Sequence, residues 1–292
     1  MNKLFVLLSI SCIVASTFGQ ISGGSASFGN RGQSGAEQAR AAELAKRNIQ
    51  TNDGRYVDAA ILMNVEADEY IAVFSISQEG KTIEEAQRKV DSAVRSFSTS
   101  LSNLKVPQSD YHVDFIAQNR IYGYDTSDPS LLKEVVVGFE VKKNFAIRFK
   151  DKNLLDQLTI QASKVGIFDL VKVDYIIKDF GPVRKKLMEE AGKIIRAKIE
   201  DQEALLGMKV GQLTVAVPGS MSTYYPVEMY ESYIAQESEE MLGYRQNVNV
   251  QRARKPRTFY YNPLSPKDFD SVINPSQVEP CVQATIYVRL KY

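Results

Sequence analysis

The chain has 292 residues, and its charges almost cancel, with 36 Lys and Arg against 35 Asp and Glu. This balance argues against a dedicated nucleic-acid surface, which needs a clustered basic excess. After residue 20 no stretch reaches the ~20 consecutive apolar residues of a membrane helix, so we expect no transmembrane segment in the mature chain.

Residues 1–19 have the three-part pattern of a secretory signal peptide. Lys3 supplies an early positive charge, residues 4–14 are mostly apolar, and residues 15–19 include small side chains suited to signal peptidase. The apolar run is too short to span a bilayer, and a buried N-terminal helix is the alternative interpretation. We therefore expect cleavage before Gln20 and a periplasmic or secreted mature protein.

The two cysteines of the chain do not define a disulfide. Cys12 raises a lipoprotein alternative, but Ser9-Ile10-Ser11 before it makes a poor lipobox. Removal of the signal leaves Cys281 alone, so no intramolecular disulfide is possible in the mature chain. Cys281 is then either a small strand side chain, which we expect, or a cross-link between chains.

Residues 20–56 are predicted to be a flexible leader with one short helix. Residues 22–35 are rich in glycine and serine, a composition typical of flexible segments. Residues 37–46 are alanine-rich and favour a helix, although the sequence does not indicate what that helix packs against.

A strand pair and a long helix open the predicted domain, which spans 57–292. The strands are expected at 57–66 and 69–78. Thr82 and Glu85 then form a capping box, in which the Thr82 hydroxyl accepts from the Glu85 amide and the Glu85 carboxylate accepts from the Thr82 amide. Steps of three and four build the apolar stripe of the helix from Ile83, Ala86, Val90, Val94, Phe97, Leu101 and Leu104.

The clearest strand pattern lies at 134–150, after a short strand predicted at 111–118. Its odd positions are apolar and its even positions mostly polar, which describes one buried and one solvated face. Lys143 interrupts this alternation. The apolar positions are Val135, Val137, Phe139, Val141, Phe145, Ile147 and Phe149.

A second helix is expected from Asp151, which can cap it, to Gly166, with a strand at 167–178. The order from 69 to 178 is then β-α-β-β-α-β, the split βαβ arrangement. We predict an α+β fold with both helices on one face of a mainly antiparallel sheet. A long third helix at 181–207, a strand at 209–217 and an alternating C-terminal strand at 282–290 follow.

Several motifs resemble landmarks of the SIMPL domain family, which includes bacterial periplasmic immunogenic and oxidative-stress-defence proteins. They are Lys81 to Ala86 at the first helix, Val137 to Asp151 at the alternating strand, Ala162 to Gly166, Glu189 to Gly211, and Val282 to Leu290. Their order and spacing carry the resemblance. The turn after Gly166 departs from the usual family pattern. The resemblance implies homo-oligomers of ring-like form and a link to envelope or oxidative-stress defence.

Catalytic motifs are missing from the sequence. His112 is the single histidine, which argues against His-based metal clusters and favours a surface or hydrogen-bonded role. Gly219 to Ser222 lacks the second glycine of a nucleophile elbow, and there is no Walker or dinucleotide fingerprint. We therefore expect no catalytic, cofactor or metal site, and interpret the protein as a non-enzyme.

Residues 218–280 are predicted to be a long polar, tyrosine-rich insertion, either functional or disordered. Tyrosine and arginine are enriched at interfaces because each combines apolar area with a polar tip. The candidate interface residues are Tyr224, Tyr225, Tyr230, Tyr233, Tyr244, Arg252, Arg254, Tyr260 and Tyr261. We expect the protein to bind itself as a homo-oligomer. The alternative is a monomeric module that uses this segment to bind a peptide, a glycan or an envelope protein.

Overall fold

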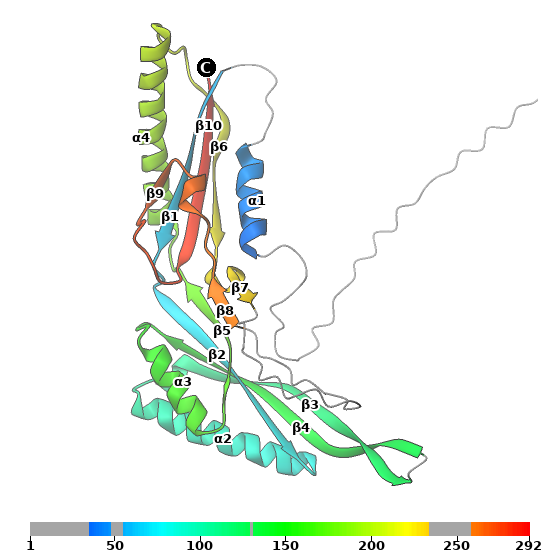
Figure 1. Ribbon diagram of the computed structural model, residues 1–292. Coiled ribbons are helices and arrows are strands. Elements are labelled where there is room, and N and C mark those ends of the chain that lie inside the picture. The colour runs from blue at the N-terminus through cyan, green and yellow to red at the C-terminus, as the bar shows by residue number, and fades with distance from the viewer. Residues whose placement is uncertain (1–34, 48–54, 129–130, 234–257) are drawn as a thin grey trace, which may run out of the picture.

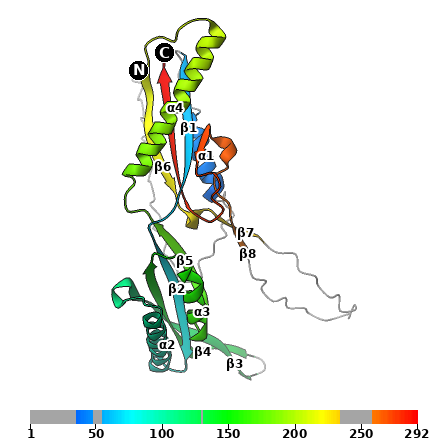
Figure 2. The same cartoon turned by 90° about the vertical axis from the view of Figure 1, so that its left-hand side faces the viewer.

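The computed structural model describes residues 35–47, 55–128, 131–233 and 258–292. There the chain forms two four-stranded sheets, one above the other along a long axis (Figure 1, Figure 2). We call the half that holds β2–β5 the lower unit, and the half that holds β1, β6, β9 and β10 the upper unit, after their places in Figure 1. No helix of the described residues is long and apolar enough to cross a membrane. The predicted signal peptide lies outside the described residues.

The helices are α1 Gly35–Arg47, α2 Ile83–Asn103, α3 Leu154–Lys164 and α4 Gly181–Leu206. The strands are β1 Tyr56–Val65, β2 Glu69–Gly80, β3 Tyr111–Asp128, β4 Leu131–Phe149, β5 Asp169–Ile176, β6 Thr214–Tyr224, β7 Tyr230–Tyr233, β8 Thr258–Tyr261, β9 Ser271–Ile273 and β10 Val282–Lys291. The short 3-10 helices η1 Gln108–Asp110, η2 Pro226–Glu228 and η3 Pro266–Asp268 complete the described elements.

The lower unit is the split β-α-β-β-α-β arrangement that the sequence predicts. Its elements follow in the order β2, α2, β3, β4, α3, β5, and its strands lie in the order β3-β4-β2-β5, with each neighbouring pair antiparallel. Helices α2 and α3 share one core with this sheet and lie beside it in Figure 2. The predicted α+β fold class is confirmed.

The core of the lower unit centres on Phe97 of α2. Its ring meets the rings of Phe74 on β2 and Phe145 on β4 edge-on, with centroids 5.7 Å and 5.0 Å away. Aromatic pairs favour this geometry, and all three side chains are buried. The sequence predicts the apolar stripe of α2 and the apolar face of β4 separately. In the structure these two surfaces pack against each other and are buried.

Helices α2 and α3 begin near the predicted capping residues, but the hydrogen bonds at their N-termini differ from the prediction. The amide of Glu85 donates to the Thr82 hydroxyl at 3.2 Å, but the Glu85 carboxylate accepts from the amide of Lys81, at 2.9 Å, rather than from that of Thr82. Asp151 was predicted to cap the second helix. The residue at the cap of α3 is instead Asn153, and Asp151 accepts a hydrogen bond from the Asn153 amide.

The upper unit is built from elements far apart in the sequence. Its strands lie in the order β6-β10-β1-β9, and β1 pairs antiparallel with β10 along its whole length. Helix α4 packs on one face through Val183, Leu187, Ala191 and Ile195. The predicted long helix and C-terminal strand thus belong to a second core, and β10 lies inside that sheet.

Helix α1 covers the opposite face of the upper sheet, which answers what this alanine-rich helix packs against (Figure 1). The polar side chains that alternate with apolar ones along β10 are therefore buried too. Gln283 is 3% exposed and Thr285 is 0% exposed. The small core on this face consists of Ala36, Ala39, Leu62, Met229 and Leu264.

Three strands differ in extent from the prediction. β3 continues to Asp128 instead of ending near residue 118, β4 begins at Leu131, and β6 runs from Thr214 to Tyr224 where 209–217 was expected. In β3 and β4 the two strands satisfy each other's backbone groups, so the polar residues after 118 stay extended. The residue pattern of a single strand does not show which strand it pairs with, so the sequence did not predict how far β3 and β4 extend.

Candidate functional site

The described parts of residues 218–280 are built into the upper unit. They supply the end of β6 and the strand β9 of the upper sheet, the separate two-stranded sheet β7-β8, and the buried apolar side chains of Pro226, Met229 and Leu264. Tyr244, Arg252 and Arg254, three of the predicted interface residues, lie outside the described residues.

Two of the predicted interface tyrosines point into the protein. The Tyr224 hydroxyl donates to Glu43 Oε1 at 2.6 Å, and the Tyr261 hydroxyl donates to the carbonyl oxygen of Cys281 at 3.1 Å. Burial raises the pKa of both phenols above the usual range, and the Glu43 carboxylate contributes for Tyr224. Both residues hold the fold together here, and neither offers its hydroxyl to a partner.

The other described candidates lie closer to the surface. Tyr230 on β7 and Tyr260 on β8 are 38% and 43% exposed, and the Tyr230 ring lies 5.8 Å from that of Tyr261. Tyr233 ends β7. Tyr225 precedes η2 and lines a groove. The structure thus brings Tyr225, Tyr230 and Tyr260 to one region, near the junction of the two units.

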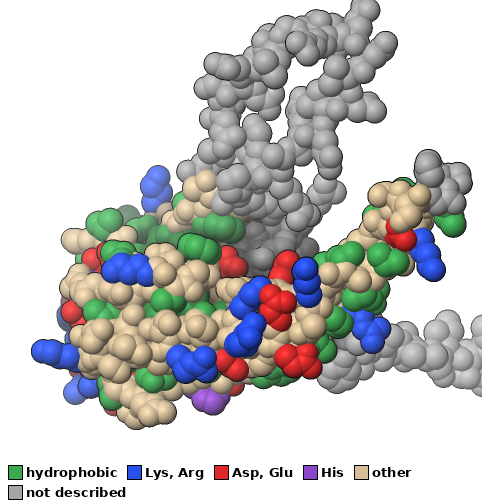
Figure 3. All heavy atoms as spheres, turned by 90° about the horizontal axis from the view of Figure 1, so that it is seen from below, with side chains coloured by type: hydrophobic (Ala, Val, Ile, Leu, Met, Phe, Trp, Pro, Cys, Tyr) green, Lys and Arg blue, Asp and Glu red, His purple; other side chains and the backbone are tan. Residues whose placement is uncertain are grey.

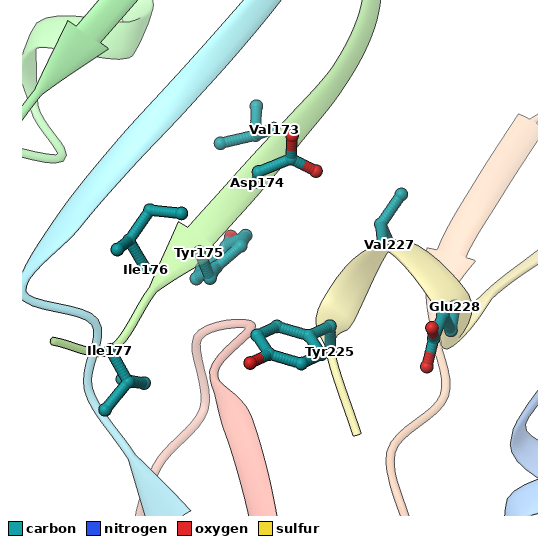
Figure 4. Close-up of a pocket in the computed structure, with 8 residues that line it drawn as sticks. All are labelled: Val173, Asp174, Tyr175, Ile176, Ile177, Tyr225, Val227 and Glu228. Atoms are coloured by element: carbon teal, nitrogen blue, oxygen red, sulfur yellow. The ribbon is translucent and has the colours of Figure 1, made fainter. Parts of the chain in front are cut away.

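The groove at this junction holds about 370 Å³ and lies between β5 and η2 (Figure 4). Its wall combines apolar side chains with the tyrosines 175 and 225 and two carboxylates. Asp174 forms an ion pair with Lys172 at 2.8 Å. The lining contains no histidine, cysteine or serine, so it offers no nucleophile with a matched base. It consists of Val173, Asp174, Tyr175, Ile176, Ile177, Tyr225, Val227 and Glu228.

A buried polar cluster fixes α1 to the upper sheet. Glu43 is 3% exposed, and its Oε1 atom accepts from Tyr224 at 2.6 Å and from Thr285 at 2.7 Å. Lys46 pairs with the same oxygen at 2.6 Å and donates to the Ser222 hydroxyl at 2.8 Å. Because Lys46 is held in this ion pair, the contact between Ser222 and Lys46 links α1 to β6 and does not form a nucleophile with a free base.

The residues considered for chemistry lie apart from one another. His112 and Asp114 form an exposed pair on β3, with Nε2 and Oδ1 2.7 Å apart. Gly219 lies within β6, close against Met188 of α4, and not at a strand-to-helix turn. Cys281 is free and buried, and burial raises the pKa of its thiol. Among the described residues, no three His, Cys, Asp or Glu side chains are grouped to hold a metal ion.

The most exposed apolar surface lies on the β3–β4 hairpin. β2 ends at Gly80, opposite Phe139, so the hairpin continues beyond the sheet as a two-stranded ribbon. We call residues 121–128 and 131–138 the arm, which projects from the body in Figure 3 with hydrophobic side chains along it. Val137, predicted on the buried face, is 55% exposed because no helix or neighbouring β2 residue reaches it.

The register of the arm places four of its exposed apolar side chains on one face, on either side of Glu134. Tyr122 is opposite Val136 and Tyr124 is opposite Glu134, and residues opposite each other or two apart share a face. Tyr122, Tyr124, Leu132 and Val136 therefore lie together, 54%, 65%, 65% and 44% exposed. Contiguous exposed apolar side chains of this kind mark interaction sites.

Comparison with family models identifies the fold's relatives. The model named SIMPL, described as a protein of unknown function (DUF541), matches residues 57–254, more than half of the chain. The chain belongs to the SIMPL family. The match begins at the first residue of the predicted domain and covers the lower unit, α4 and β6, so the resemblance seen in the sequence motifs is confirmed.

Other comparisons add little to this SIMPL protein. Comparison with curated proteins gave no match. One solved structure, "The crystal structure of AtUAH in complex with (S)-hydroxyglycine", is 10% identical, with a TM-score of 0.18. That alignment covers 47% of this chain and only 34% of the other chain, and a likeness this weak carries no argument.

The arm is the surface that sequence reasoning missed. Its signal was present: residues 121–124 and 135–137 are aromatic or β-branched for the most part and flank the turn residues at 127–129. Two such runs around a short turn favour a hairpin. The polar residues at 118–120 concealed it, because they interrupt the alternation of β3.

Proposed function

We propose that this SIMPL protein is an exported, non-catalytic protein that acts by self-association in the periplasm or at the cell envelope. The observation that carries the proposal is the exposed apolar face of the arm, formed by Tyr122, Tyr124, Leu132 and Val136. Leaving these side chains in water is unfavourable, and contact with another copy would cover them. Export rests on the signal-peptide pattern of residues 1–19.

The test compares two sets of substitutions in the chain that starts at Gln20. One variant changes Tyr122, Tyr124, Leu132 and Val136 to Thr. The matched control changes four other exposed apolar residues to Thr: Ile160, Phe168, Leu205 and Val278, which are 55%, 78%, 84% and 91% exposed. Light scattering should show an oligomer for the unchanged chain and the control, and a smaller species for the arm variant. A monomeric unchanged chain at every concentration would refute self-association.

Export has a separate test. The N-terminal sequence of protein recovered outside the cytoplasm should begin at or near Gln20, because residues 15–19 are suited to signal peptidase. Retention of Met1, or a lipid on Cys12, would refute the proposed processing.

The proposed link to oxidative-stress defence rests on the family resemblance. A deletion strain that tolerates peroxide as well as its parent would refute this link.

A monomeric binding module is the second candidate, and the groove of Figure 4 favours it. Among the described strands β5 pairs only with β2, so its outer edge beside Tyr225 could pair with an extended peptide, while the apolar wall takes the peptide's side chains. Under this alternative the unchanged chain is monomeric, and Tyr225→Ala weakens peptide binding while the arm substitutions do not. Light scattering and peptide titration therefore separate the two proposals.

A further inference from the structure

A second exposed apolar surface lies where α4 ends, at the opposite end of the molecule from the arm (Figure 1). Gly207, with a φ of +64°, ends the helix, and a hollow of about 340 Å³ lies beside it. Leu206 and Met208 of its lining are 49% and 56% exposed. We call this hollow the α4 end. Its lining combines apolar side chains with two cations and includes Arg55, Leu206, Met208, Lys209, Val210 and Tyr292.

Hydrogen bonds fix the α4 end and leave one of its cations unpaired. The Glu203 carboxylate accepts from the Val210 amide at 2.9 Å and pairs with Lys209 at 2.8 Å. The Tyr292 amide donates to the Arg55 carbonyl oxygen at 3.0 Å, which holds Tyr292 beside Arg55. The exposed Arg55 side chain takes part in none of the ion pairs between described residues. Arg55 is therefore the cation that a partner can engage.

The arm carries the opposite charge on the same kind of apolar surface. Glu134 lies opposite Tyr124, and it is two residues from both Leu132 and Val136, so it shares their face. Glu134 is exposed and, like Arg55, takes part in none of the ion pairs between described residues. An apolar face with one unpaired carboxylate thus matches an apolar hollow with one unpaired guanidinium.

Only another copy can bring these two surfaces together, because they lie at opposite ends of one chain (Figure 1, Figure 2). Contact between the apolar faces of two arms would cover Glu134 of both copies, while Lys133, the only cation of the arm, points to the other face. A carboxylate that is removed from water without a partner is costly. Docking on the α4 end gives Glu134 a guanidinium, whose planar donors match a carboxylate.

We infer that the arm of one copy docks on the α4 end of a second copy, with Glu134 paired to Arg55 and the apolar face of the arm against Leu206 and Met208. This inference rests on the proposed self-association and names its two surfaces. The contact is heterologous, because the two copies contribute different surfaces. A copy that has docked its arm still offers its own α4 end, so association continues beyond two copies.

Charge exchange tests the ion pair. Glu134→Arg and Arg55→Glu each place like charges in the contact, and in light scattering each should raise the dissociation constant at least about tenfold. Both substitutions in one chain, or an equal mixture of the two variants, restore opposite charges and should recover association. The matched controls are Glu189→Arg and Arg184→Glu, the same charge changes on the exposed surface of α4, and they should associate normally. Failure of both recoveries would refute the ion pair.

A mixing experiment distinguishes this contact from one between two arms. The arm variant of the self-association test keeps an intact α4 end, whereas Met208→Asp keeps an intact arm. Each should be monomeric alone. Their equal mixture should form a dimer with one copy of each and nothing larger, because that dimer has no second working arm and no second working hollow. Leu205, which belongs to the control set of the self-association test, does not line the hollow, so that control still associates.

The outcomes separate this inference from the proposed function. If the unchanged chain is monomeric at every concentration, self-association fails and the docking fails with it. If the unchanged chain is oligomeric and Arg55→Glu and Met208→Asp keep its mass, self-association stands and docking on the α4 end is wrong. A dimer that forms only when the arm variant and Met208→Asp are mixed would support both.

Discussion

The two sheets of this protein use the same strand alternation in different environments. In the lower unit one face of the sheet packs on α2 and α3, while the other carries polar residues such as Arg148 and Lys172. In the upper unit α4 covers one face and α1 covers the other, so Gln283 and Thr285 are buried with hydrogen bonds. A polar strand residue is therefore a solvent contact in one unit and a structural pair in the other.

The largest expected effect is on the free energy of unfolding, and it compares a buried with a half-buried phenylalanine of β4. Phe145 is fully buried against Phe97, whereas Phe139 lies near the base of the arm and is only half-buried. Phe145→Ala should lower the free energy of unfolding by about 3–5 kcal/mol, and Phe139→Ala by clearly less. Urea titrations of both variants give the comparison. Equal losses would mean that the core continues into the arm.

The next effect tests the polar attachment of α1 to the upper sheet. Glu43→Ala leaves the hydroxyls of Tyr224 and Thr285 without their acceptor, and should cost roughly 2–3 kcal/mol. Glu189→Ala, on the exposed surface of α4, is the control and should stay within about ±0.5 kcal/mol. Denaturant titration measures both. A neutral Glu43→Ala would mean that α1 contributes little to the stability of the upper unit.

A smaller effect should appear in how the stability of the upper unit depends on pH. Although burial opposes it, hydrogen bonds from Tyr287 and Arg289 hold the pKa of Asp58 below its usual value of 3.8. A carboxyl with a lowered folded-state pKa stabilises the fold above its unfolded pKa, and this contribution is lost as the pH falls through the folded value.

Asp58→Asn should therefore lose more stability near neutral pH than at pH 3. Asp91→Asn offers the matching measurement in the lower unit, where a hydrogen bond from Lys143 lowers the pKa of Asp91. Urea titrations at both pH values measure the difference. If Asp58→Asn loses the same free energy at pH 3 and at neutral pH, then Asp58 does not contribute through its charge.

The smallest effect on stability is expected in the arm. Tyr124 is 65% exposed and lies outside both cores, so Tyr124→Thr should change the free energy of unfolding by no more than about ±0.5 kcal/mol. The same variant should associate less than the unchanged chain if the arm is an interface. A large loss of stability in the monomer would show instead that the arm packs on the body.

Sequence reasoning worked best where the signals are local. The capping box at Thr82 and the left-handed glycines at 166 and 207, with φ of +78° and +64°, mark helix ends at the predicted places. Alternation in β4 identified Val141 and Ile147 as buried. It failed at Val137, because burial there depends on where the neighbouring strand β2 stops.

The sequence by itself determined the order of the lower unit and its family, because periodicity and caps act within a few turns of chain. Only the tertiary structure decided that β1 and β10 form a separate sheet, that α1 has a buried site, and that the β3–β4 hairpin extends as an arm. Those features depend on pairs such as Glu43 and Thr285, which are 242 residues apart. No pattern in a local window contains a contact over that separation.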